Sequence, residues 1–433
     1  MVDLERSGRL RTDRGGSTPQ GEGDQLNRRV SSQRPGSFPR FVMSLTQWSF
    51  NTTLLFLGFL LGPAASGSIA QAQVSTAPLR EEVRVGSVWD QDRMLTDVGG
   101  IAVYGDSLLL VLERIDHAIK VFDWSGEPVG QIGRYGSGPG EFRDPTTLHV
   151  RNDTIFVRNV GAASLVLLNI LGEELARFTF PWITVADGTG VIRGPSGMLP
   201  DGTFLGYVTA SRPQLFEDRK DYYLPTLKIS PSGEVLDTLA MRRRTTGRSI
   251  SATEIGRPRF RLPAETPSDI GVTSSGLGIV ATAEPFPPGH EAHYRITSIN
   301  HTGDTVFSRL YSFQPQRIKG DQLTALALAY SRSVRDSRRV RNEVEKAYAA
   351  RPYVSPVSRL RIDSDGRFWV AREEVPGQPI LWEVLTRLGE PLFRVELSAG
   401  VRLWFTSGDL LWAEERDDLG VPFIVRYRIL IPD

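Results

Sequence analysis

Short apolar runs, separated by clusters of Gly, Asp, Asn and Ser, dominate the chain beyond Arg80. Six segments share one form, in which an apolar run reaches such a cluster and returns as a second apolar run: residues 101–113, 148–159, 197–208, 271–282, 360–371 and 402–414. Turn residues that tolerate a positive φ, between runs rich in Val, Ile, Phe and Trp, are typical of β-hairpins. The pattern therefore predicts six hairpins.

A second predicted hairpin follows each of the first five. These segments contain two extended runs around a Gly and an acid, and they cover residues 119–133, 165–178, 227–239, 294–310 and 382–397. Two hairpins make a four-stranded unit, and the sixth unit stops after its third strand, at residues 423–430. An unpartnered extended run at residues 81–89 can supply the missing strand. The sequence predicts an all-β, six-bladed β-propeller over residues 81–433, in which an N-terminal strand closes the last blade.

The segment GRYGSGPGEFRDP, residues 133–145, joins the first predicted unit to the second. Its glycines permit a tight path, and Phe142 is expected to wedge between adjacent blades. A phosphate-binding loop would lie between a strand and a helix, and no helical pattern follows Phe142. We interpret the segment as a connector between blades.

This connector resembles the G-x-G-x-G-P-G-E-F-x-x-P segment of NHL-type six-bladed propellers. The run DHAIKVFD, residues 116–123, is similar to the third strand of that family, with Ala118 in place of the customary Arg. The detailed resemblance covers residues 101–157 and implies the propeller fold. NHL-like and gluconolactonase-like enzymes bind a divalent metal at the central tunnel, so the resemblance also directs attention to the innermost strands.

One stretch departs from the β pattern, at residues 319–352. Leu323, Leu326, Tyr330 and Val334 recur at helical spacing, and Pro352 marks a stop. We expect a helical insertion between blades 4 and 5, either one bent helix or a pair.

Three segments precede the predicted propeller. Residues 1–40 contain almost no large apolar side chains, which predicts a disordered extension. Residues 41–72 contain LLFLGFLLG and then AQAQ, a pattern typical of a signal peptide cut after Ala72 or of a membrane anchor. Residues 73–80 are expected to form a linker. The mature protein is therefore expected to be exported, to the periplasm or the extracellular space, with no membrane attachment after cleavage.

Charge and cysteine content restrict the partners. Lys and Arg number 51 against 50 for Asp and Glu, and this balance gives no reason to expect a nucleic-acid partner. The chain has no cysteine, which excludes disulfides, thiol catalysis and cysteine-bound zinc. We expect a monomer without a required cofactor.

Residues at the start of each innermost strand are the candidates for binding. Three aspartates and three arginines occupy such places: Asp97, Asp144, Asp269, Arg193, Arg359 and Arg402. Carboxylates around a channel can hold Ca²⁺, whereas a single Asp before a strand is usually a turn or strand-end cap. The arginines suit an anionic ligand, or ion pairs with those same aspartates. His149, within an innermost strand, is expected to be a packing residue.

Two function classes remain open. A binding scaffold would present the long insertions, at residues 211–224, 242–267 and 319–352, to a protein, peptide or glycan. A metal-dependent hydrolase or lyase would place its site at the central tunnel, where three or four side chains from distant blades suffice. We expect the scaffold, because no nucleophile, general base or tight ligand set can be identified in the sequence.

Overall fold

The structure is a computed structural model, and its contacts divide the chain into two units, Met1–Ile69 and Ala70–Asp433. The described residues are 74–431, with gaps at 180–182, 185–189, 211–220, 246–248, 251–259, 262–269, 274–275, 280, 284–291, 373–374 and 376 and over most of 332–356. The predicted disordered extension and the predicted signal peptide or anchor lie outside the described residues. No helix in the described part is long and apolar enough to cross a membrane.

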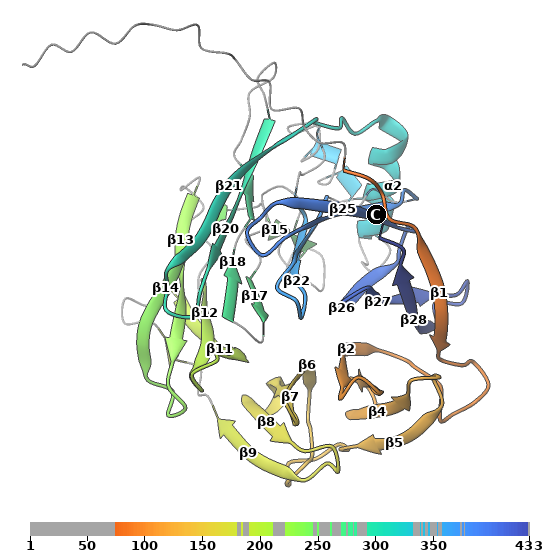
Figure 1. The fold of residues 1–433 in the computed structure, drawn as a ribbon, viewed down its shortest axis with the longest axis vertical. Helices are drawn as coiled ribbons and strands as arrows, with labels where there is room; N and C mark the ends of the chain where they lie inside the picture. Colours follow the sequence, from red (N-terminus) through yellow and green to blue (C-terminus); the bar gives the residue numbers. More distant parts are fainter. Residues whose placement is uncertain are drawn as a thin grey trace, which may run out of the picture. The chain divides into compact units, whose positions relative to one another are not determined.

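Five antiparallel sheets hold four or five strands each, and they follow one another around a common axis (Figure 1). Blade 1 contains β2 (Val98–Tyr104), β3 (Leu108–Glu113), β4 (Ala118–Asp123) and β5 (Pro128–Ile132). Blade 2 contains β6 (Pro145–Arg151), β7 (Thr154–Asn159), β8 (Ser164–Leu168) and β9 (Glu174–Thr179), with the short 3-10 helix η1 (Val160–Ala162) before β8. Blade 3 contains β10 (Ile183–Thr184), β11 (Gly190–Met198), β12 (Phe204–Ala210), β13 (Asp221–Ile229) and β14 (Val235–Thr245).

The last two sheets complete this set. Blade 5 contains β22 (Arg359–Ile362), β23 (Phe368–Ala371), β24 (Ile380–Leu385) and β25 (Pro391–Leu397). Blade 6 contains β26 (Arg402–Ser407), β27 (Leu410–Arg416), β28 (Pro422–Ile429) and β1 (Leu79–Val85). The innermost strands of neighbouring blades contact each other, as β26 does with β2, and β2 with β6.

The fourth predicted unit forms two smaller sheets. One pairs β17 (Ile270–Thr273) with β18 (Gly276–Ile279), and the other contains β19 (Ala281–Ala283), β20 (Ala292–Ile299) and β21 (Thr305–Phe313). A short hairpin, β15 (Ser249–Ile250) with β16 (Phe260–Arg261), precedes them. The structure thus contains five complete blades, and the fourth unit is divided between two sheets.

Within the predicted helical insertion, the structure describes the helix α2 (Gly320–Ser331). Most of residues 332–352 lie outside the described residues, so a bent helix or helical pair stays a prediction. Elsewhere the described chain consists almost entirely of strands and turns, as the hydrophobic pattern predicted.

The N-terminal strand closes blade 6, as predicted. β1 pairs antiparallel with β28 and forms the outer strand of the order β1-β28-β27-β26. The predicted bounds need correction, because the strand covers Leu79–Val85 and ends before Trp89, whose side chain is 93% exposed. Val85 at its end is fully buried, and Gly86 after it has φ +131°, a conformation that ends the extended run.

The predicted linker is also structured where it is described. The Ala77 N–H donates to the Arg394 carbonyl (2.7 Å), and the Arg394 N–H donates to the Ser75 carbonyl (2.9 Å). The Leu430 N–H donates to the Pro78 carbonyl (2.9 Å). Residues 75–78 therefore connect the outer strand of blade 5 with blade 6, and the small Ala77 side chain is buried between them.

Apolar clusters fill the space between adjacent blades. Blades 5 and 6 share a core that includes Trp369, Trp382 and Leu411, and blades 6 and 1 share one that includes Trp412 and Phe122. These three Trp side chains are buried. Because each blade buries both faces, most of its stabilisation comes from its neighbours.

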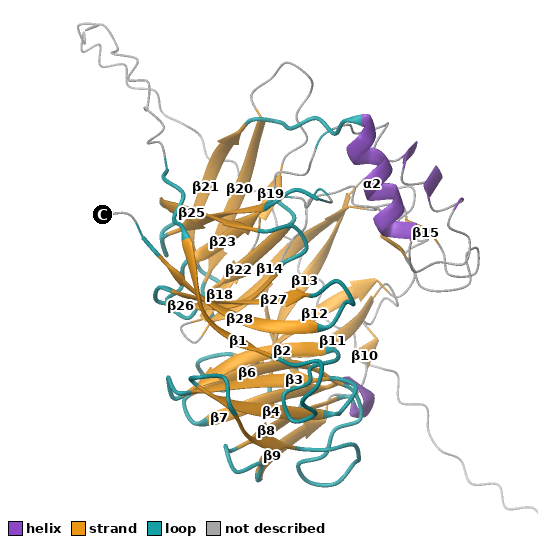
Figure 2. Ribbon diagram, turned by 90° about the vertical axis from the view of Figure 1, so that its right-hand side faces the viewer, coloured by secondary structure: helices purple, strands orange, loops and turns teal. Residues whose placement is uncertain are grey.

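The antiparallel order of the strands divides the turns between two faces. We call the face where each first strand begins the entry face and the opposite face the exit face. On the exit face the connections within the blades are short turns, such as those after Tyr104, Asp123 and Asn169. The strands joined by the connections through residues 211–220, 246–269, 284–291 and 314–358 end and begin again at the entry face. Figure 2 shows α2 and β15, which belong to two of these connections, on the same side of the strands.

The connector at residues 133–145 lies between blades 1 and 2, as predicted. The Phe142 side chain is fully buried in the core that both blades share. Gly133 has φ +83°, and a Cβ atom there would lie 2.3 Å from Phe142 Cε2, so the approach of this ring requires glycine. The loop N–H groups of Gly138 and Gly140 donate to Glu141 and Glu174 (2.8 Å each), so protein carboxylates occupy this loop.

Phe142→Ala should lower the free energy of unfolding by about 3–5 kcal/mol, because it leaves a cavity where two blades meet. Urea denaturation of the purified protein measures this change. Tyr135→Ala, in the same connector at a side chain that is 67% exposed, is the matched control and should cost far less. Equal losses in the two variants would contradict the wedge role of Phe142.

Candidate functional site

Four of the six predicted residues lie at the entry face, where the first strands begin. Arg359 and Arg402 are the first residues of β22 and β26, and Asp97 and Asp144 immediately precede β2 and β6. Arg193 lies in β11, paired with Tyr207 in β12. Asp269 lies outside the described residues.

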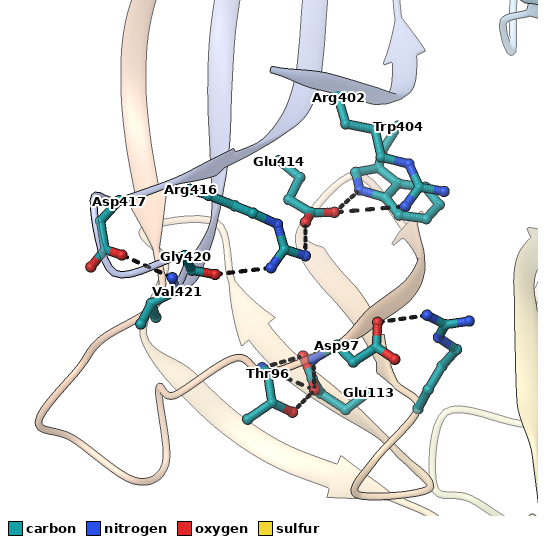
Figure 3. Close-up of polar contacts among 11 residues, drawn as sticks. Thr96, Asp97, Glu113, Arg402, Trp404, Glu414, Arg416, Asp417, Gly420 and Val421 are labelled. Carbon is teal, nitrogen blue, oxygen red and sulfur yellow. Dashed lines mark hydrogen bonds and ion pairs between the residues drawn. The ribbon is translucent and has the colours of Figure 1, made fainter. Parts of the chain in front are cut away.

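In blades 1 and 2, a buried polar side chain at the end of the second strand accepts hydrogen bonds from the residues that precede the first strand. In blade 1 the Glu113 carboxylate accepts hydrogen bonds from the Thr96 hydroxyl (2.6 Å) and from the N–H groups of Thr96 and Asp97 (3.1 and 3.0 Å) (Figure 3). In blade 2 the Asn159 amide oxygen accepts the Asp144 N–H in the same way (3.1 Å). These buried groups position the backbone at Asp97 and Asp144, which is a structural role.

Asp97 also has a cationic partner. Its carboxylate lies 2.7 Å from a guanidinium nitrogen of Arg114, the residue that follows β3. The Asp97 hydrogen bond raises the pKa of Arg114, so the pair favours the charged form of the arginine. The partner is Arg114 and not one of the three predicted arginines, so this ion pair differs from the predicted pairing.

Arg402 is held against an aromatic ring. Its guanidinium carbon lies 3.7 Å from the centroid of the Trp404 ring (Figure 3). The Trp404 indole N–H donates to the buried Glu414 carboxylate (3.0 Å), and Glu414 also accepts from Arg416 (2.5 Å). Glu414 therefore orients the ring on which Arg402 stacks, while Arg402 itself lies 4.0 Å from the carboxylate.

Positive charge is concentrated around Arg402. Burial lowers the pKa of Arg402, the Glu414 carboxylate raises it, and nearby guanidinium groups lower it again. Those groups belong to Arg361, Arg359 and Arg114. Each of these charges makes a bound anion more favourable at the same place.

His149 differs from the packing residue that the sequence indicated. Leu148 and Val150, its neighbours in β6, contact the core between blades 1 and 2, whereas the His149 side chain is accessible to solvent. The pKa of His149 is lowered, first because the surrounding protein displaces part of the water around the ring and second by the charge of Arg361 in blade 5. The correction has a simple cause, because alternate residues of a strand point to opposite sides.

Sequence reasoning missed four contributors to this region. Arg361 follows Arg359 at the spacing that places two side chains on one side of a strand, and this signal was available. The roles of Glu113, Trp404 and Glu414 depend on contacts that no spacing reveals. In the described part of the chain, no three His, Asp or Glu side chains are grouped so that they could hold a metal ion.

Comparison with known proteins agrees with this architecture. A family model described as a 6-bladed beta-propeller matches residues 90–185. Together with the blades described above, this match decides the fold class. The described part of the chain is a β-propeller. A search of curated proteins found no match.

Solved structures with the same fold are distant in sequence. A member of the DUF4221 family from Bacteroides vulgatus has 10% identity and a TM-score of 0.50, over 83% of this chain and 100% of that chain. A Bacteroides fragilis protein described as exported has 15% identity and a TM-score of 0.45, over 81% and 95%. The PQQ-bound aldose sugar dehydrogenase of Streptomyces coelicolor has 13% identity and a TM-score of 0.40, over 82% and 99%. These likenesses concern the fold alone.

His149 predicts a pH dependence of stability. Its folded-state pKa is below the ordinary value of 6.5, so the unfolded chain binds the proton more readily and stability falls as the pH decreases through 6.5. His149→Gln should therefore flatten the dependence of Tm on pH between about pH 7 and pH 5. His301→Gln, in an exit-face turn, is the control. An unchanged pH profile in the His149 variant would contradict this assignment.

Proposed function

We propose that this protein is an exported binding propeller whose entry face recognises a protein, peptide or glycan. The observation that carries the proposal is the division of the connections between the two faces. The strands on either side of residues 211–220, 246–269, 284–291 and 314–358 end and begin again at the entry face, while the described turns of the exit face are tight turns within the blades. Loops on one face of a rigid scaffold are the usual location of recognition sites.

Exposed apolar side chains on the entry face support this assignment. Trp89, in the connection from β1 to β2, is 93% exposed, and Leu419, in the turn from β27 to β28, is 84% exposed. The backbone beside Trp89 is held in place, since the N–H groups of Trp89 and Asp90 donate to the Ser87 hydroxyl (3.1 and 2.9 Å). Exposed aromatic side chains on an ordered backbone are frequent anchors of binding surfaces.

The carboxylates of the entry face favour binding over the alternative of a metal-dependent hydrolase or lyase. Glu113 accepts backbone and hydroxyl hydrogens, Asp97 pairs with Arg114, and Glu414 accepts from Trp404 and Arg416. Each is thus engaged in holding the scaffold. We accordingly propose a function without a required metal, and Ca²⁺ at Asp97, Asp144 or Asp269 is not part of the proposal.

The remaining features complete the proposal. We propose six blades, with β17–β18 and β19–β20–β21 as parts of the fourth, and an NHL-type relationship on the strength of the connector at residues 133–145. The apolar run at residues 54–62 and the AQAQ segment support export, with cleavage after Ala72 and no membrane attachment afterwards. We also propose that the exported protein is a monomer. The near-neutral charge balance supports a partner other than nucleic acid.

Peptide and glycan arrays probed with the purified mature chain test this function. A ligand found on either array should bind about tenfold more weakly to Trp89→Ala, because that change removes an entry-face anchor. Leu171→Ala, at a 79% exposed side chain in an exit-face turn, is the matched control and should bind as the unchanged protein does. Binding that depends on Leu171 and not on Trp89 or Leu419 would contradict the assignment to the entry face.

A further inference from the structure

The region around the first residue of β26 combines features that point to a particular ligand chemistry. This inference rests on the proposed function and concerns the same entry face. Arg402 lies at the start of the innermost strand of blade 6, and Arg359 and Arg361 lie in the innermost strand of blade 5. Two adjacent blades thus bring three guanidinium groups within electrostatic range of one another.

Stacking on Trp404 fixes the orientation of the Arg402 guanidinium and leaves its N–H groups directed to the side of the ring. With the guanidinium carbon 3.7 Å from the Trp404 ring centroid, one face of the group is covered, while the side chain remains 49% exposed. The ring is fixed in turn, because its N–H donates to Glu414. A guanidinium held in this way loses little conformational freedom when its N–H groups form two parallel hydrogen bonds to an oxyanion.

The acidic groups beside Arg402 have closer cationic partners. Glu414 lies 2.5 Å from Arg416, against 4.0 Å from Arg402. Asp97 lies 2.7 Å from Arg114. Glu414 thus completes the Trp404 and Arg416 contacts, and its ion pair with Arg402, at 4.0 Å, is longer than a hydrogen bond.

We propose that Arg402, supported by Arg359 and Arg361, binds an oxyanion group of the ligand, a carboxylate or a phosphoryl group. The planar fork of Arg402 selects a group with two oxygens side by side, and the two other arginines add attraction for negative charge. The charge of Arg361 lowers the pKa of His149. A bound anion would have the opposite effect and favour the protonated form of this histidine.

Calorimetric titrations with citrate and with inorganic phosphate test the proposal on the full mature chain. At least one of these anions should bind, and Arg402→Gln should weaken that binding about tenfold or more, the loss typical of a charge-assisted hydrogen bond. Arg402→Lys keeps the charge but lacks the planar fork, so it should also bind more weakly. The anion that binds identifies the group as carboxylate or phosphoryl.

Arg309→Gln is the matched control, because it removes an equal charge at a 45% exposed side chain on the outer strand β21. It should bind as the unchanged protein does. Thermal unfolding without anion should leave Arg402→Gln close to the unchanged protein, and Arg359→Gln serves in its place if it does not. Absence of binding by both anions, or equal weakening in the Arg309 variant, would overturn the proposal. Array ligands that require Trp89 and ignore Arg402 would overturn it while leaving the proposed function intact.

Discussion

The pairing of β1 with β28 is the interaction on which the rest of the propeller depends. It joins Leu79–Val85 to the last strand of the chain, so that the first and last strands form one sheet. Side chains reinforce the pairing, since Glu82 accepts from Arg428 (2.6 Å), and that hydrogen bond lowers the pKa of Glu82. Without β1, the edge of β28 would expose unpaired N–H and carbonyl groups.

Closure of blade 6 also fixes its contact with blade 1. Arg426 in β28 donates to the Trp124 carbonyl (3.0 Å), and its guanidinium carbon lies 4.4 Å from the Trp124 ring centroid. Trp124 packs edge-on against Trp412 of blade 6. The same two blades carry Arg402, Asp97 and Arg114, so the geometry of the entry face depends on this closure.

The sequence predicted those parts of the fold that depend on neighbouring residues. Gly126, Gly172, Gly233, Gly303 and Gly389 all have positive φ in the turns predicted from a Gly and an acid. The side chain at the first turn position accepts the N–H two or four residues later, as Asp123 does from Ser125 and Glu127 (2.9 Å each). The buried position of Phe142 could be predicted as well, because its glycine-rich surroundings permit only a tight path.

Long-range contacts set the limit of that prediction. The start of β1 at Leu79 depends on Ile429, its partner in β28, and the local pattern alone placed the strand later. His149 in blade 2 and Arg361 in blade 5 influence each other although more than two hundred residues separate them. The site candidates were chosen by position within each repeat, which located them at one face but could not reveal that Glu414 orients Trp404 beneath Arg402.

Amide hydrogen exchange at residues 79–85 of the purified protein tests the central claim, closure by the N-terminal strand, most directly. The account predicts that the alternate β1 amides that point to β28 are protected to an extent comparable to the central β28 residue Val425, because both strands belong to one cooperative sheet. Exchange of the β1 amides at the rate of an unstructured peptide, while Val425 remains protected, would contradict it.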